Sequence, residues 1–274
     1  MVEKDIEEII DRKLSIRKDE ERIKDKDLFE VVEEVFDRRT VLAVIELCRR
    51  KCLKRLKGVV SAGKEARVYW AKGPNNEDLA VKIYLTVTAE FRKSIWKYIK
   101  GDPRYEWIGK LPRHKLMVVW CRKEFSNLKR LYKAGVKVPK PVCWYQNILV
   151  MEFVGREGVR APLLKELYEA GSLTEDFAEK LFWKIVDQIK RMYWRAGLVH
   201  ADLSEYNIMV WNDEPYIIDV SQAVRLDHPN AQGFLYRDIY NIVRFFREDV
   251  GLDIPSPDEI YKDVVEGEEG REYE

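Results

Sequence analysis

The sequence predicts an α+β protein of two lobes, in which a small β-rich lobe precedes a helical one. The first indication is a change of texture at Gly58: neither Gly nor Pro occurs before it, and short apolar stretches separated by turns follow it. The second is the return of long helical patterns after residue 155. The third is size and composition, because 274 residues with 46% hydrophobic and 12% aromatic side chains can form a substantial core and exclude wholesale disorder.

Four segments are expected along the chain. Residues 1–57 should form an N-terminal helical extension, in which an apolar stripe through Leu42, Ile45 and Leu47 runs among charged side chains. Residues 58–154 should form the β-rich lobe and the strand that leaves it, residues 155–250 the helical lobe, and residues 251–274 an acidic tail.

The expected elements follow from apolar periodicity and from turn residues. In the first lobe they are strands at 59–60, 66–70, 79–84 and 148–153, a loop at 100–112, and a helix at 118–134 that stops at Gly135. In the second lobe a long helix at 174–196 begins after Thr174 as N-cap, with Glu175 and Asp176 in its first turn. Strands at 208–211 and 216–220 and a last helix at about 235–248 follow.

The sequence also indicates the cellular compartment of the protein. No apolar run approaches the roughly 18 residues of a membrane span, and the charged start of the chain, Met1 to Asp5, lacks the apolar core of a signal peptide. We therefore expect a cytoplasmic protein without a membrane partner. Cys48 and Cys52 lie one helical turn apart with no histidine nearby, so a zinc site lacks ligands, and all four cysteines are expected to be reduced thiols.

The near-zero net charge conceals a strong asymmetry. Lys and Arg total 49 and Asp and Glu total 48, a formal net charge of +1, which argues against a uniformly basic nucleic-acid binder. Residues 84–140, however, hold 15 basic and 4 acidic side chains, a net charge of +11, whereas residues 251–274 hold 2 and 9, a net charge of −7. A partner with a phosphate backbone is therefore conceivable only for the basic segment.

Two segments of the first lobe are suited to bind phosphate. The turn at 61–66, with Ser61, Gly63 and Lys64, has little side-chain bulk, so its backbone N–H groups can approach phosphate oxygens. Many hairpins look like this, so the turn by itself is a weak signal. Lys82 lies inside an apolar strand, and Glu124 on the helix at 118–134 is its natural partner. The alternative is that Glu124 lies on the solvent-exposed face of this helix and does not pair with Lys82.

Two segments of the second lobe carry the chemistry. In the run His200 to Asn207, which follows a long helix and precedes a strand, Asp202 can accept a proton from an attacking hydroxyl or water, and Asn207 can ligate a metal. Asp219 ends the next apolar strand and is expected beside Asn207, as a second oxygen ligand for Mg²⁺ or Mn²⁺. His200 is better interpreted as a core histidine that braces the loop.

All four segments, in this order, resemble those of the RIO kinases, an atypical protein kinase family, and within it the type-one branch; we expect an archaeal member. The resemblance spans about residues 40–250 and is most specific in His200 to Asn207. It implies a bilobal protein-kinase-like fold with a truncated helical C-lobe. It also implies ATP with Mg²⁺ or Mn²⁺ as cofactors, Lys82 as phosphate contact, Asp202 as catalytic acceptor, and Asn207 and Asp219 as metal ligands.

The resemblance implies further roles. Glu152 and Val154 would hold adenine through the Glu152 carbonyl and the Val154 amide, and Asp219 would form an aspartyl-phosphate during ATP hydrolysis. The family works on maturing small ribosomal subunits, so the basic segment 84–140, with its interleaved aromatic residues such as Trp96 and Tyr98, could contact ribosomal RNA; a solvated surface is the equally weighted alternative. Ser94 could be an autophosphorylation target.

Two other functions stay open at this point. A small-molecule phosphotransferase of the aminoglycoside or choline type shares the spacing of Asp202 and Asn207, but would need an acidic pocket in the second lobe for its cationic substrate. An inactive scaffold that binds nucleotide or pre-ribosomes is the other alternative, and the presence of Lys82, Asp202, Asn207 and Asp219 together argues against it.

Overall fold

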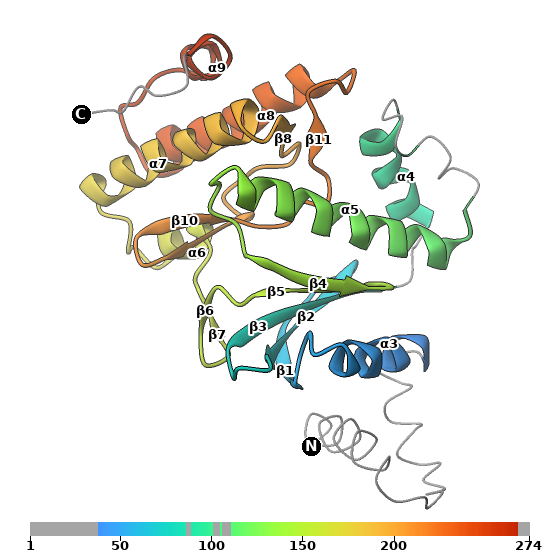
Figure 1. Cartoon of the computed structure of the whole chain (residues 1–274). Helices are drawn as coiled ribbons and strands as arrows, with labels where there is room; N and C mark the ends of the chain where they lie inside the picture. Colours follow the sequence, from blue (N-terminus) through green and yellow to red (C-terminus); the bar gives the residue numbers. More distant parts are fainter. Residues whose placement is uncertain (1–37, 86–88, 101–104, 106–110, 268–274) are drawn as a thin grey trace, which may run out of the picture. The chain divides into compact units, whose positions relative to one another are not determined.

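The structure is a computed structural model that describes residues 38–85, 89–100, 105 and 111–267. The chain divides into two compact units (Figure 1). Of the described residues, the first unit contains 38–85, 112–125 and 141–160, and the second contains 89–100, 105, 111, 126–140 and 161–267. These units differ from the expected boundaries at 57, 154 and 250, because tertiary contacts assign parts of the middle segment to different units.

A five-stranded antiparallel sheet forms the first unit, in the order β1-β2-β3-β5-β4. Its strands are β1 (Arg55–Ala62), β2 (Ala66–Lys72), β3 (Asp78–Tyr84), β4 (Pro141–Tyr145) and β5 (Ile148–Glu152). The continuous apolar run of β3 is explained by its place at the centre of the sheet, where six consecutive residues from Leu79 are buried. A short hairpin follows β5; its two strands, β6 (Gly155–Arg156) and β7 (Val159–Arg160), have two residues each.

Helix α3 (Arg38–Arg49) packs against this sheet and belongs to its core. Leu47 is fully buried together with Val44 of the same helix, whereas Leu42 is exposed. The end of the expected helical extension is therefore an integral layer of the first unit, and β1 begins at Arg55 rather than at Val59. Residues 1–37 of that extension lie outside the described residues.

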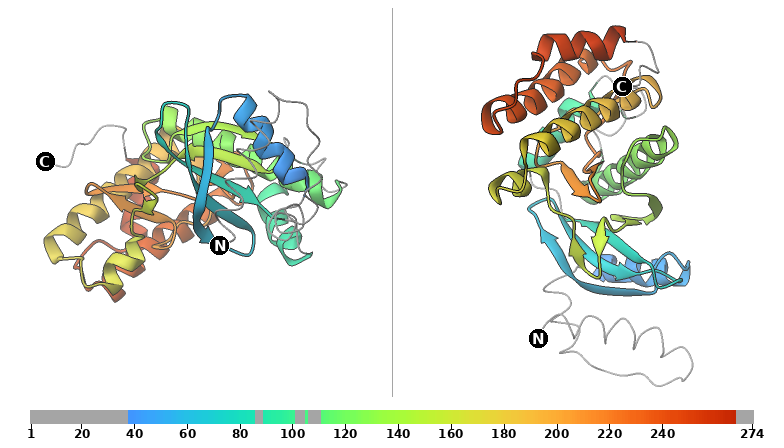
Figure 2. Two further views of the ribbon diagram at one scale, coloured as in Figure 1. Left: turned by 90° about the horizontal axis from the view of Figure 1, so that it is seen from below. Right: turned by 90° about the vertical axis from the view of Figure 1, so that its left-hand side faces the viewer.

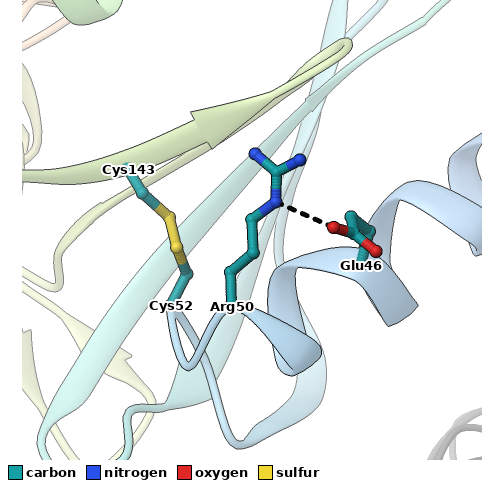
Figure 3. Close-up of a disulfide and its surroundings, with 4 residues drawn as sticks. All are labelled: Glu46, Arg50, Cys52 and Cys143. Carbon is teal, nitrogen blue, oxygen red and sulfur yellow. Dashed lines mark hydrogen bonds and ion pairs between the residues drawn. A yellow bond between two sulfur atoms is a disulfide. The ribbon is translucent and has the colours of Figure 1, made fainter.

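A disulfide between Cys52 and Cys143 corrects the expectation that all four cysteines are reduced thiols (Figure 3). The bridge joins the segment after α3 to β4, across 91 residues of sequence and a Cα–Cα distance of 6.3 Å. Arg50, which pairs with Glu46 at 2.9 Å, also lies 4.3 Å from the ring centre of Tyr145 on β4. Sequence spacing gave no sign of the bridge because only the packing of α3 against the sheet brings the two cysteines together.

The second unit is built on three helices that lie side by side: α7 (Glu175–Trp194), α8 (Ala231–Arg244) and α9 (Pro257–Glu266) (Figure 2). As expected, Thr174 is the N-cap residue of α7 and Glu175 and Asp176 occupy its first turn. A single π-helical turn, η2 (Phe245–Asp249), continues α8. Two further helices contribute: α4 (Ala89–Ile99), which the sequence analysis missed, and α6 (Leu164–Glu169).

Helix α5 (Arg113–Lys133) starts five residues earlier than expected and ends just before Gly135, which adopts a positive φ of 77°. Residues 112–125 of this segment belong to the first unit and residues 126–140 to the second. Most of the expected loop at 100–112 lies outside the described residues.

The acidic C-terminal segment is not a loose tail in the part that the structure describes. Ser256 caps α9 in a reciprocal capping box with Glu259, and Pro257 occupies the first turn. The helix is held by an ion pair between Lys190 and Asp263 of 2.7 Å and by the indole N–H of Trp194, which donates to the Val264 carbonyl. The excess of acids therefore serves in part to join α9 to its own unit.

Short strand pairs complete the second unit and present its polar loops. Strand β8 (Leu198–Val199) pairs with β11 (Val224–Arg225), and β9 (Ile208–Trp211) pairs with β10 (Glu214–Ile217). Among the described residues, no helix combines the length and the apolar character that crossing a bilayer requires.

The disulfide should stabilise the first unit by restricting the unfolded chain. Closing a 91-residue loop lowers the entropy of the unfolded state, so we expect Cys143→Ser to reduce the free energy of unfolding by about 2–4 kcal/mol. Guanidinium unfolding without reductant measures this loss, with Cys48→Ser as the matched control outside the bridge. Dithiothreitol should destabilise the wild type and leave Cys143→Ser unchanged; equal effects of the reductant on both proteins would contradict the assignment.

Candidate active site

The turn between β1 and β2 has the openness expected of a phosphate loop. The Gly63 N–H donates to the Ala66 carbonyl at 3.0 Å, which closes the turn, and a Cβ on Gly63 would lie only 3.2 Å from that carbonyl. Ser61, Gly63 and Lys64 are all exposed. These three residues can therefore be reached by a ligand, and their role in phosphate binding stays a prediction.

The ion pair expected between Lys82 and Glu124 is present in the first unit. Lys82 Nζ lies 2.9 Å from Glu124 Oε1, with Lys82 9% and Glu124 1% exposed. Tyr84, two residues further along β3 on the same face, donates its hydroxyl to Glu124 Oε2. A buried carboxylate of this kind is tolerated because both of its oxygens accept hydrogen bonds from a cation and a hydroxyl. The pair fixes the lysine ammonium at one position on the sheet.

Burial also changes the pKa of a neighbouring thiol, that of Cys121. Cys121 lies one turn before Glu124 on α5 and is fully buried. Its burial, followed by the negative charge of Glu124, raises the pKa of the thiol well above its usual value. This cysteine therefore stays protonated, as the sequence analysis expected of a structural thiol.

At the end of β5, successive backbone N–H and C=O groups point alternately toward β3 and away from it. Leu79 of β3 pairs with Glu152, and the next N–H along, that of Phe153, donates to the Asp78 carbonyl at 3.3 Å. Because successive peptide groups of a strand point in opposite directions, the Glu152 carbonyl and the Val154 N–H are expected to point away from β3. This is the pattern that recognition of an adenine edge by these two residues requires.

In the second unit, strand pairing brings the expected metal ligands to adjoining positions. Ile208 at the start of β9 pairs with Ile217 at the end of β10, and the Ile218 N–H donates to the Asn207 carbonyl at 3.0 Å. Asn207 immediately precedes β9 and Asp219 follows β10 by two residues. Their proximity therefore follows from the register of one hairpin.

The side chains in this region have defined orientations. Asn207 Nδ2 donates to the Asp202 carbonyl at 2.8 Å, which leaves Asn207 Oδ1 as the oxygen that can bind a metal. Ser221 Oγ donates to Asp219 Oδ1 at 3.0 Å, and Asp219 itself has a positive φ of 56°. His200, 1% exposed, contacts the Ile218 carbonyl through Nε2 at 3.0 Å, the bracing role expected for it.

These oxygens fit Mg²⁺. An amide oxygen and a carboxylate are hard ligands, and Mg²⁺ in phosphoryl-transfer sites commonly takes only one or two protein oxygens, with phosphates and water completing its shell. Among the described residues no cluster of three or more His, Cys, Asp or Glu side chains could hold a metal ion. Asn207 and Asp219 are the residues that would hold the ion.

The electrostatics of Asp202 suit a proton acceptor. Burial raises the pKa of this carboxyl above its usual value, and the negative charge of Asp219 adds to the effect, while His200, Arg237 and Lys97 oppose it. A carboxylate with a raised pKa holds a proton more readily, which is what accepting a hydroxyl proton during attack requires.

Sequence reasoning missed the residues that hold the loop around Asp202. Asp238 of α8, 2% exposed, accepts from the Ala201 N–H at 2.7 Å and the Leu203 N–H at 2.9 Å, one on each side of Asp202. Arg237 donates to the Ala201 carbonyl and thereby holds the peptide between Ala201 and Asp202, which lies between the two peptides bound by Asp238. Ala201 needs this support because its φ is +68°, an unfavourable value for a residue with a Cβ.

Two further polar side chains of the same unit were missed. Asn241 of α8 donates to the Leu203 carbonyl at 3.1 Å, and buried Asn127 of α5 donates to the Val220 carbonyl at 2.9 Å. The signal that could have found the α8 residues is a charged residue, Asp238, at a position of the apolar helix stripe shared with Leu235 and Ile242. A carboxylate in a core position predicts a specific set of hydrogen-bond donors.

Asp238 predicts a pH-dependent stability. Burial raises its pKa to about 7, against the opposing effects of the Leu203 and Ala201 N–H groups and of Arg237. Between about pH 4 and pH 7 the unfolded chain releases this proton while the folded chain keeps it, so the folded state loses stability as the pH rises. From about pH 4 to pH 7, the free energy of unfolding of the wild type should therefore fall by a few kcal/mol relative to that of Asp238→Asn.

Urea unfolding at several pH values from 4.5 to 7.5 measures the difference between the two proteins. Asp176→Asn, in the exposed first turn of α7, is the matched control and should follow the wild type in parallel. A stability difference between wild type and Asp238→Asn that does not change with pH would contradict the raised pKa.

Comparisons with known proteins show the family of the chain. A family model described as the RIO domain matches residues 67–259. The chain is 42% identical over 251 residues to the RIO-type serine/threonine-protein kinase Rio1 of Haloferax volcanii, covering 91% of this chain and 83% of that protein. It is also 42% identical to the Rio1 kinase of Methanocaldococcus jannaschii, over 78% of this chain and 70% of the relative.

The human serine/threonine-protein kinase RIO1 is 40% identical over 82% of this chain, but this chain spans only 39% of that longer protein. A crystal structure of the Rio2 kinase–ADP/Mg²⁺–phosphoaspartate complex from Chaetomium thermophilum has the same fold, with a TM-score of 0.61 at 24% identity over 83% of this chain and 65% of that one. From these matches and the site geometry, the chain belongs to the RIO family of atypical serine/threonine protein kinases, in its RIO1 branch.

Proposed function

We propose that this kinase binds ATP and transfers its γ-phosphate, acting in the cytoplasm in the maturation of small ribosomal subunits. Lys82, held by Glu124, would contact the phosphates, and the Glu152 carbonyl and Val154 amide would bind adenine. The turn with Ser61, Gly63 and Lys64 would cover the phosphates.

The observation that carries the proposal is the arrangement of Asp202, Asn207 and Asp219 at adjoining strand ends. Asp202, with its raised pKa, would accept the proton of the attacking hydroxyl. Mg²⁺ bound by Asn207 and Asp219 would neutralise charge on the phosphates. The protein's own contribution is orientation, since Asp238 and Arg237 fix the loop and Ser221 fixes the Asp219 carboxylate.

A second fate for the phosphoryl group is an aspartyl-phosphate at Asp219. The Rio2 relative whose structure is named for a phosphoaspartate supports this route by analogy. One oxygen of Asp219 would attack the γ-phosphorus, the bond to the β-phosphate oxygen would break to release ADP, and water would then hydrolyse the acyl phosphate to inorganic phosphate and the free carboxylate. The chain would then act chiefly as an ATPase that switches between states on a pre-ribosomal particle.

ATP turnover tests this function. Asp202→Ala should reduce turnover with Mg²⁺ by about 10²–10⁴-fold, because a positioned proton acceptor is lost, while Asp213→Asn in the exposed β9–β10 turn should behave as wild type. Small-subunit particles should stimulate the wild type. Replacing Mg²⁺ with Mn²⁺ in the same assay identifies the preferred metal.

Three outcomes would contradict the proposal. Absence of turnover with either metal and with particles would favour a nucleotide-binding scaffold. Stimulation by an aminoglycoside or by choline, in place of particles, would favour a small-molecule phosphotransferase. Equal turnover by wild type and Asp202→Ala would remove the catalytic role of this loop.

Binding to ribosomal RNA is supported by the exposed part of the basic segment. The exposed residues include Lys93, Trp96 and Lys97 on α4 and Lys100 directly after it. Trp96 is 41% exposed, so its ring can stack on a base. Tyr98 is unsuitable, because it is buried and its ring lies 5.7 Å from that of Phe234 on α8. The side chain of Ser94, the proposed autophosphorylation target, lies outside the described residues.

Salt dependence of RNA binding tests this part of the proposal. Alanine at Lys93, Lys97 and Lys100 together should lower the slope of log affinity against log salt concentration by up to about 2, because each lost contact to single-stranded phosphate removes about 0.7. Alanine at three exposed lysines outside the segment, Lys54, Lys180 and Lys262, is the control. Unchanged slopes for both triple variants would contradict RNA binding by the basic segment and indicate an ordinary solvent-exposed surface.

A further inference from the structure

A single carboxylate, Asp78, ties the strand that would bind adenine to the rest of the first unit. Its Oδ1 accepts from the Trp70 indole N–H at 2.7 Å and lies 2.6 Å from Lys72 Nζ. Its Oδ2 accepts from the Glu157 N–H at 3.1 Å, and its main-chain carbonyl accepts from the Phe153 N–H. The residue therefore contacts the chain both within and just after the segment 152–154.

The segment that Asp78 holds has a backbone that needs external support. Three residues of the β6–β7 hairpin have positive φ: Gly155 at 142°, Glu157 at 52° and Gly158 at 83°. Glycine and left-handed positions permit many alternative conformations, so a hairpin this short does not fix the direction of its own peptide groups. Figure 1 shows this hairpin directly after β5.

A second contact fixes the hairpin against the same part of the sheet. A Cβ on Gly158 would lie 2.8 Å from the ring of Trp70, so the glycine backbone packs directly on the indole that also donates to Asp78. Hydrogen bonds from Lys72, Trp70 and the Glu157 N–H outweigh the effect of burial and hold the pKa of Asp78 below its usual value. The carboxylate is therefore charged, and its hydrogen bonds are of the stronger, charge-assisted kind.

We propose that Asp78 is a positioning residue that sets the selectivity of this kinase for adenine over guanine. The inference rests on the proposed binding of adenine by Glu152 and Val154. Adenine offers an amino donor and a ring-nitrogen acceptor on the edge that a carbonyl and an amide N–H would read, whereas guanine offers a carbonyl acceptor and an N–H donor in the reverse order. A backbone fixed in one orientation rejects guanine because polar groups would remain unpaired, and a backbone free to reorient would tolerate it.

Asp78→Asn tests the proposal because it keeps the shape and removes the charge. The KM for ATP should rise about 5–20-fold with kcat within about twofold of wild type, and the preference for ATP over GTP in kcat/KM should fall about tenfold. Trp70→Phe, which keeps a ring against Gly158 but removes the indole N–H, should shift both quantities in the same direction by a smaller factor. Glu77→Gln is the matched control, since Glu77 is the exposed neighbouring acid and its carboxylate accepts from the Asn75 N–H in its own turn.

Thermal unfolding of each variant accompanies the kinetics, so that a loss of folding is recognised directly. A lower melting temperature or lower kcat in both variants with unchanged KM and unchanged ATP-to-GTP preference would overturn the proposal and leave Asp78 a structural role only. If the wild type neither binds nor hydrolyses ATP, the proposed function itself fails. The two failures are therefore distinguishable.

Discussion

The loop around Asp202 depends on one buried carboxylate. Asp238 accepts hydrogen bonds from the amides of Ala201 and Leu203, which lie immediately before and after Asp202. The positive φ of Ala201 directs the chain through a turn that a residue with a Cβ resists, and these two bonds stabilise that turn. Without them the position of the Asp202 carboxylate would not be fixed, and neither would that of the Asn207 side chain bound to the Asp202 carbonyl.

The first unit holds a cation, the Lys82 ammonium, in the middle of an apolar sheet. Lys82 lies on the central strand, and burying its ammonium is costly unless a carboxylate and further hydrogen bonds compensate. Glu124 supplies the carboxylate, and Tyr84 binds the second carboxylate oxygen. A lysine fixed in this way loses little further conformational freedom when it binds a phosphate, which is the physical advantage of the arrangement.

Much of this could be predicted from local sequence, because the relevant signals span only a few residues. The central strands and the proximity of Asn207 to Asp219 follow from apolar runs and from the register of one short hairpin. The ion pair of Lys82 with Glu124 spans 42 residues, and it was expected because a lysine inside an apolar strand needs a carboxylate partner. The anchors on α8 could not be predicted in the same way. Their partners lie 35 to 38 residues away in sequence, and only the packing of the helix against the loop pairs them.

The same distinction explains the corrections. The sequence alone determined which residue types could carry phosphoryl-transfer chemistry and in which elements they lie, because periodicity and turn residues act over short distances. The tertiary structure decided the bridge between Cys52 and Cys143, the docking of the acidic helix α9, and the support of the segment 152–154 by Asp78. These contacts depend on segments 70 to 91 residues apart meeting in space, and their stability comes from packing that a local sequence pattern does not reveal.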